Sequence, residues 1–199
     1  ECKRLFVCPV NMRHHWIELI NYEIKEARAK RPAEMIVKLN SLSDQALIQK
    51  IYEAAAAGVV VKLIIRGIYC AYSQNKKYKK DIYAVSIVDE YLEHARVLIF
   101  HHSGKEKTYI SSADWMLRNL DHRVEVAVEI TNRHIKKELW NILNIHLHGN
   151  VKARILDKPL SNKYVSSEGK KKIRSQIEIY NYLKEEAKKK ITGMANHHA

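Results

Sequence analysis

The sequence predicts an α/β sandwich, with helices on both faces of a mixed, mostly parallel sheet. Three nearly continuous apolar runs, at 4–10, 35–39 and 59–65, indicate buried strands. The two segments between them carry apolar residues every three or four positions, which is the period of an α-helix. This β-α-β-α-β order favours parallel strands joined by right-handed crossovers. The 199 residues, 46% of them hydrophobic, are enough for one domain with a sizeable core.

The first two helices have clear start and stop signals. The first is predicted at 13–30, and Pro32 follows it because proline cannot continue a helix. The second is predicted at 44–57. Asp44 is its candidate N-cap and Gly58 its candidate stop.

The second half of the chain contains shorter elements. Strands are expected at 81–86, 96–101, 107–111 and 123–130, with a helical turn at 88–92. Gly104 predicts a hairpin between the second and third of these strands, and Asn132 is expected to cap a helix that ends near Leu147. We therefore expect one domain over residues 1–199. Its α/β core would span 1–158, with an irregular segment and a closing helix over 159–199.

The charge of the chain points to polyanions. The net charge is +13, and a chain this basic attracts nucleic acid, nucleotides, polyphosphate or an acidic membrane surface. For the lysine runs at 76–80 and 188–190, a solvated surface is the better interpretation.

Cysteine content and hydropathy bear on the compartment. Three cysteines do not support a disulfide scaffold, and the chain has no apolar run of about eighteen residues that would span a membrane. A reducing cytoplasm is therefore the expected location, with membrane association of a full-length protein left open. The chain begins without methionine and enters strand-like sequence almost at once, so we expect it to be a piece of something larger.

The carboxyl ends of the predicted strands supply candidate ligand-binding residues, because ligands of α/β sheets bind there. Those ends carry Lys38, Asn40 and Arg66, followed later by Ser112. The planar donor fork of Arg66 suits a phosphate, although a salt bridge to a neighbouring acid is the alternative. For Lys38 alone the two interpretations are evenly balanced.

His94 is the candidate for the chemical centre, because histidine transfers protons near neutral pH and can attack phosphorus. Arg96 follows it at once, and a hairpin with small hydroxyl residues comes next. The histidines at 101, 102, 122 and 134 are better explained as satisfied structural residues.

His94-x-Arg96, Ser111-Ser112-Ala113-Asp114 and then Glu125 together resemble the phospholipase D superfamily. Its pattern is His-x-Lys-x-x-x-x-Asp, then Gly-Ser-x-Asn and a later Glu. Here arginine replaces the lysine, His101 stands where the acid is expected, and Asp114 replaces the asparagine. These departures argue against an ordinary phosphodiesterase.

A narrower resemblance covers nearly the whole chain. Five blocks, in order, are similar to the polyphosphate kinases that make long-chain polyphosphate from ATP. They are Ile36–Asp44, Leu63–Ile68, Tyr91–Arg96, Tyr109–Met116 and Arg118–Glu125. Asn162–Val165 and Ile179–Leu183 also resemble that family's C-terminus.

The resemblance implies that the chain is the last, phospholipase D-like catalytic domain of a longer enzyme, which is oligomeric when complete. The phosphorylated histidine nucleophile and the Mg²⁺ site then lie in the preceding domain, so this chain itself supplies no metal ligand. ATP/ADP and polyphosphate are the implied substrates, and the other domains of the same enzyme are the implied partners.

Arg66 and His94 match the nucleotide-binding residues. His94 would act as the acid/base or phosphate-stabilising group. Supporting roles fall to Lys38, Asn40, Ser112, Asp114, Arg118, Asp121, Arg123 and Glu125.

Two other functions stay open on the sequence. One is an independent phospholipase D-like nuclease or phosphodiesterase, in which each of two protomers gives one histidine motif. The other is a non-catalytic module that binds polyanions. The missing acid at position 101 speaks against the first, and the five family blocks speak against the second.

Overall fold

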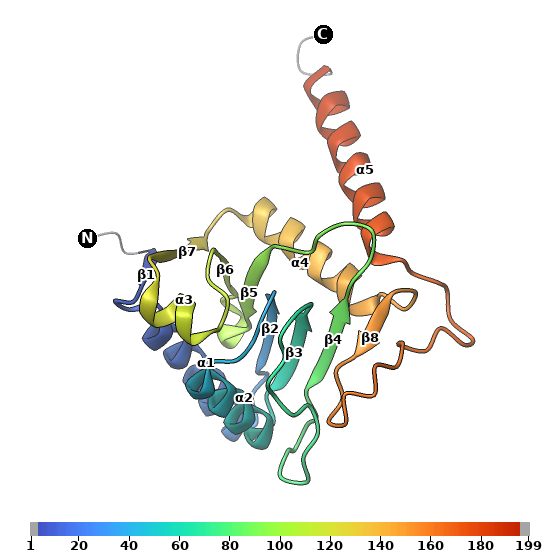
Figure 1. The fold of residues 1–199 in the computed structure, drawn as a ribbon. Helices are drawn as coiled ribbons and strands as arrows, with labels where there is room; N and C mark the ends of the chain where they lie inside the picture. Colours follow the sequence, from blue (N-terminus) through green and yellow to red (C-terminus); the bar gives the residue numbers. More distant parts are fainter. Residues whose placement is uncertain (1–3, 196–199) are drawn as a thin grey trace.

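A computed structural model describes residues 4–195, with side chains described as far as residue 190. The strands are β1 (Leu5–Cys8), β2 (Glu34–Leu39), β3 (Val60–Ile65), β4 (Tyr83–Ile87), β5 (Arg96–Phe100), β6 (Lys107–Ser111), β7 (Glu125–Ile130) and β8 (Ala153–Ile155). The helices are α1 (Met12–Arg28), α2 (Gln45–Ala57), α3 (Leu117–His122), α4 (Arg133–His148) and α5 (Ser175–Ala195), with a 3₁₀ turn at His102–Gly104. Figure 1 shows these elements arranged around one twisted sheet.

The strands form one sheet in the order β1-β7-β6-β5-β2-β3-β4-β8. Its mixed α/β character is confirmed, but the expectation of a mostly parallel sheet is wrong. Only the β2–β3 and β3–β4 pairs are parallel, whereas the other five pairs are antiparallel. The β-α-β-α-β pattern describes the chain as far as β3. Beyond β4 the chain crosses to β5, on the other side of β2, and then forms the antiparallel neighbours β5–β6 and β6–β7 by short connections. Helix α4 then connects β7 to β8, which pairs antiparallel with β4 at the opposite edge of the sheet.

Helices cover both faces of the sheet, as predicted. On one face, α1 and α2 pack over a cluster that includes Trp16, Leu47 and Phe100. On the other face, α4 packs over a smaller cluster that includes Ile64 and Leu143. Successive residues of a strand point to opposite faces, so β2 contributes to both clusters.

Capping residues explain where α2 begins and ends and where α4 begins. The Asp44 carboxylate accepts a hydrogen bond from the Leu47 amide at 3.0 Å, and the Asn132 side chain accepts one from His134 at 2.9 Å. Gly58 ends α2 with φ of 103°, a left-handed conformation that glycine adopts without steric cost. Both predicted N-caps are therefore confirmed.

The segment 88–95, which joins β4 to β5, forms neither helix nor strand, so the helical turn expected at 88–92 is wrong. The other end of the chain is also distinctive. Helix α5 begins against α4 and then extends away from the sheet (Figure 1). Ser175 and Gln176, in its first turn, are buried. Within residues 4–195, no helix is long and apolar enough to cross a membrane.

Candidate active site

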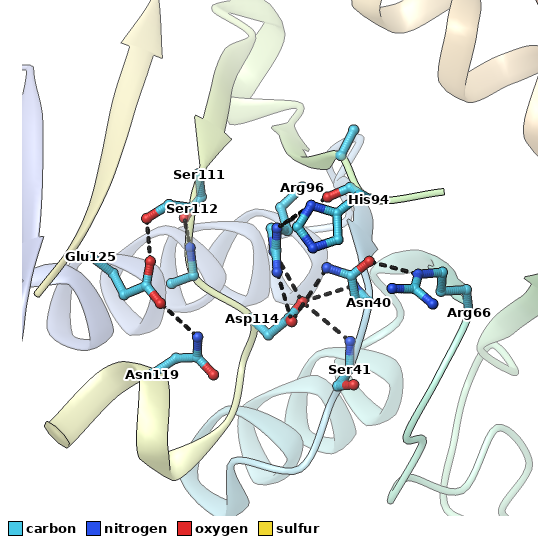
Figure 2. Close-up of polar contacts among 12 residues, drawn as sticks. Asn40, Ser41, Arg66, His94, Arg96, Ser111, Ser112, Asp114, Asn119 and Glu125 are labelled. Atoms are coloured by element: carbon cyan, nitrogen blue, oxygen red, sulfur yellow. Dashed lines mark hydrogen bonds and ion pairs between the residues drawn. The ribbon is translucent and has the colours of Figure 1, made fainter. Parts of the chain in front are cut away.

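The candidate residues gather at one rim of the sheet. Strands β2, β3 and β6 end there, whereas the antiparallel strands β5 and β7 begin there. This arrangement brings Asn40, Arg66 and Asp114 to the same edge as Arg96 and His94 (Figure 2). Residues that are far apart in sequence therefore meet because of the order and direction of the strands.

Asp114 is the hub of this edge. Its carboxylate accepts five hydrogen bonds, from the backbone amides of Asn40 and Ser41, the Asn40 side chain, and two nitrogens of Arg96. The Arg96 Nη2 to Asp114 Oδ2 distance is 3.0 Å, and both side chains are largely buried. An arginine–aspartate ion pair thus occupies the two positions at which the phospholipase D pattern has lysine and asparagine. The aspartate balances the arginine charge in a fixed, two-pronged geometry.

Asn40 connects the hub to Arg66. Its Oδ1 accepts from Arg66 Nε at 2.8 Å, while its Nδ2 donates to Asp114 at 3.3 Å. The backbone holds the same two strand ends together, since the Gly67 amide donates to the Asn40 carbonyl at 2.8 Å. A Cβ on Gly67 would lie 2.9 Å from that oxygen, so this close approach requires glycine. With Nε occupied, both terminal nitrogens of Arg66 make no hydrogen bond to any described residue.

His94 lies at the other end of the chain of contacts and is exposed. Arg96 Nη1 donates to the His94 carbonyl at 3.1 Å and approaches His94 Nδ1 at 3.3 Å. Because arginine only donates, this contact is a hydrogen bond in the tautomer that carries its proton on Nε2, in which Nδ1 accepts. That tautomer offers an N–H group at the rim.

A second polar cluster lies beside this network. The Glu125 carboxylate accepts hydrogen bonds from the Ser112 hydroxyl and, at 2.7 Å, from the Asn119 side chain. Ser112 also accepts from the Val126 amide at 3.1 Å. Figure 2 shows this cluster on the other side of Asp114 from His94. The carboxylate that contacts Arg96 is therefore Asp114, whereas Glu125 bonds to two residues of the segment between β6 and β7.

The other predicted site residues lie elsewhere. Lys38 is buried beneath the rim, and its Nζ lies 3.1 Å from Glu93 Oε2. Asp121 forms an ion pair with Arg13, which also bonds Asp44, and this contact lowers the pKa of Asp121. Arg118 and Arg123 are exposed, and neither forms a hydrogen bond or ion pair with the described residues.

His101, where the phospholipase D pattern has an acid, lies at the opposite end of β5. Phe100, just before it, pairs with Met35 near the start of β2, away from the rim that carries His94. Position 101 therefore has no contact with the candidate site, and it does not distinguish hydrolysis from phosphoryl transfer.

The sequence interpretation missed the residues beneath His94. Glu93 contacts Lys38, His146 on α4, and Gln176 on α5. Glu93 lies inside a family-like block, but Gln176 is 83 positions away. No local signal predicts that contact.

Among the described residues, no group of three histidine, cysteine, aspartate or glutamate side chains could hold a metal ion. The oxygens of the two rim carboxylates, Asp114 and Glu125, already accept hydrogen bonds from protein donors and are not free to bind a metal ion. The residues described here therefore do not fit a magnesium site.

Comparison with known protein families shows to which family this chain belongs. Residues 5–176 match the family described as polyphosphate kinase C-terminal domain 2. The chain belongs to this family. A polyphosphate kinase of Vibrio parahaemolyticus is 44% identical over 180 residues, which cover 90% of this chain and 26% of the relative. The chain thus spans about a quarter of the length of that relative.

Solved structures agree with the family assignment. The crystal structure of polyphosphate kinase from Porphyromonas gingivalis matches 94% of this chain and 29% of its own, at a TM-score of 0.90 and 38% identity. Nuc from Salmonella typhimurium, a phospholipase D family member, matches 77% of this chain and 98% of its own, with a TM-score of 0.56 and 12% identity. That identity supports a shared fold only. The predicted phospholipase D-like α/β class is confirmed.

Proposed function

We propose that this chain is the C-terminal catalytic domain of a polyphosphate kinase, which transfers the terminal phosphate of ATP reversibly to inorganic polyphosphate. The observation that carries the proposal is the continuous path Arg66–Asn40–Asp114–Arg96–His94 at one rim, in a chain of this family. Each end of the path carries donors that no described residue occupies: the two terminal nitrogens of Arg66 at one end and the Nε2–H of His94 at the other. The assignment of all 199 residues to this one domain stays a prediction, as do the cytoplasmic location and the oligomeric state of the full enzyme.

Each end of the path has a role in phosphoryl transfer. A phosphoryl group in transfer carries negative charge on its outer oxygens, and catalysis is mostly positioning and charge stabilisation. Arg66 would hold phosphate oxygens of ATP or ADP with its two free nitrogens. His94, in the tautomer with its proton on Nε2, would donate a hydrogen bond to the oxygen between the transferred group and ADP. Of the two roles expected for His94, we propose phosphate stabilisation, because the contact of Nδ1 with Arg96 leaves Nε2–H as the group that can donate.

In this proposal the nucleophile is a histidine nitrogen of the preceding domain. It forms a bond to the γ-phosphorus as the bond to the ADP oxygen breaks, and a terminal polyphosphate oxygen later takes the phosphoryl group from it. Mg²⁺, bound outside the described residues, would neutralise charge on the phosphates.

The test compares the full-length enzyme with the 199-residue chain alone. The full-length enzyme should make polyphosphate from ATP, whereas the isolated chain should make none, because it lacks the nucleophile. Product is measured as labelled polyphosphate retained on a gel. Robust synthesis by the isolated chain would overturn the proposal that the nucleophile lies in the preceding domain. Hydrolysis of an activated phosphodiester by the isolated chain would instead favour the nuclease or phosphodiesterase alternative.

Arg66 offers a sharper test of the nucleotide site. In the full-length enzyme, Arg66→Ala should raise the KM for ATP and lower kcat/KM by roughly 100-fold, because a charge-assisted phosphate contact is lost. Arg66→Lys should recover only part of the loss, since lysine lacks the planar fork. Arg133→Ala, which removes an exposed arginine from the start of α4, is the matched control and should leave the kinetics unchanged. An unchanged KM in Arg66→Ala would remove Arg66 from the site.

A further inference from the structure

The segment that carries His94 has little structure of its own. Residues 88–95 form neither helix nor strand, and the hydrogen bond from the His94 amide to the Leu92 carbonyl, at 3.1 Å, lies within the segment. His94 itself is exposed. A catalytic imidazole needs a fixed position, so the contacts that hold this segment decide where the ring lies.

Glu93 provides the main anchor. Its side chain is only 15% exposed, and it meets residues from three elements beneath the rim. Oε2 lies 3.1 Å from Lys38 Nζ on β2 and 3.3 Å from His146 Nε2 on α4. Oε1 accepts a hydrogen bond of 2.9 Å from Gln176 on α5. Lys38 also donates to the Ala95 carbonyl at 3.4 Å, so the residues on both sides of His94 are held.

The first turn of α5 holds the preceding part of the segment. Gln176 accepts from the Tyr91 amide at 2.9 Å and donates to the Tyr91 carbonyl at 2.8 Å. Just before the helix, Arg174 donates to both oxygens of Asp89, each at 2.9 Å. The burial of Gln176 is therefore explained by this clamp, and the position of α5 is coupled to the segment that carries His94.

The charges are consistent with an ionised anchor. Burial alone would raise the pKa of Glu93, but His146, Lys38 and Gln176 together lower it to about 2. Burial also lowers the pKa of Lys38, and Glu93 acts in the opposite direction. The carboxylate thus supports the cationic form of Lys38, which is costly to bury without a partner.

We propose that Glu93, clamped by Lys38, His146 and Gln176, is a positioning residue that fixes the His94 imidazole at the rim. This inference rests on the proposed role of His94. Nothing in the Glu93 anchor touches Arg66, which is held separately by Asn40. Loss of the anchor should therefore affect turnover more than nucleotide binding.

The experiment uses Glu93→Gln and Gln176→Ala in the full-length enzyme, with Glu90→Gln as the matched control. Glu90 lies in the same segment, but its side chain is exposed and, among the described residues, bonds only to Arg174, which keeps its contact with Asp89. Both anchor variants should lower kcat by about 10- to 100-fold with the KM for ATP within about twofold. The control should match the wild type. If Glu93→Gln does not fold, Gln176→Ala still tests the proposal. The Gln176→Ala variant removes no charged group, so Lys38 keeps its buried partner Glu93.

A second arm separates positioning from a general loss of structure. If Glu93 acts through His94, Glu93→Gln should cause no further loss in a His94→Ala background. An equal loss in both backgrounds would overturn the proposal.

Hydrogen exchange at the His94 amide tests the position of the segment independently of enzyme activity. The exchange rate should be at least about tenfold faster in both anchor variants than in the wild type. Unchanged exchange would also overturn the proposal. Near-normal activity of His94→Ala alone would overturn the role of His94 instead, and the exchange data would still decide whether Glu93 holds the segment.

Discussion

Asp114→Ala is expected to lower the free energy of unfolding by about 3–5 kcal/mol, because it leaves a largely buried arginine without its counter-charge. The same change removes the acceptor for the Asn40 and Ser41 amides at the end of β2. Asp114 is only 6% exposed, so water cannot easily replace the carboxylate. Urea unfolding of the 199-residue chain, followed by circular dichroism, measures the effect.

Two variants control this prediction. Asp114→Asn restores the asparagine of the phospholipase D pattern and keeps one acceptor oxygen, so it should cost less than the alanine variant, about 1–3 kcal/mol. Asp121→Ala also removes an aspartate paired with arginine, but Arg13 keeps its contact with Asp44, and only a small change is expected. If Asp114→Ala unfolds at the wild-type urea concentration, Asp114 is not the hub of the rim.

His94→Ala is expected to lower polyphosphate synthesis by the full-length enzyme by about 100- to 1,000-fold, the usual loss when one preorganised donor to the transition state is removed. Synthesis from ATP and the reverse transfer from polyphosphate to ADP should fall together, since both pass through the same transition state. The fold should be unaffected, because the His94 side chain is exposed. It contacts Arg96 through Nη1, so its removal leaves the ion pair between Arg96 Nη2 and Asp114 intact.

The choice of substitution separates the two roles of His94. The side-chain amide introduced by His94→Gln offers an N–H group near the place of the imidazole Nε2, so a hydrogen-bonding role predicts partial recovery over His94→Ala. A proton-transfer role predicts none, because an amide does not titrate. His122→Ala, at the exposed end of α3, is the matched control and should behave as wild type. Near-normal synthesis by His94→Ala would remove this histidine from the site.

The sequence predicted part of the cluster at the rim because the relevant side chains follow strand ends. Asn40 and Arg66 come directly after two buried apolar runs, and such runs can be recognised without a structure. His94 and Asp114 were recognisable from the spacing of a family pattern. The partners of these residues were not predictable, since Asn40 and Asp114 are 74 positions apart and nothing local links them.

Lys38 illustrates the limit most clearly. It lies two residues before Asn40 on the same strand, so the sequence placed both on one rim. The structure buries Lys38 beneath the rim, where it pairs with Glu93, while Asn40 lies beyond the strand and bonds Asp114. Alternation along a strand predicts which residues share a face. It does not predict which residue from another element will meet them.

By itself, the sequence determined the class of the fold, the caps of α2 and α4, and the residues that carry the family pattern. These depend on local periodicity and on side chains that bond to their own neighbouring backbone. Only the tertiary structure decided the largely antiparallel pairing, the ion pair of Asp114 with Arg96, and the contacts of Glu93 with Lys38, His146 and Gln176. Each of these depends on contacts between distant segments, which form because the sheet and its covering helices bring them together.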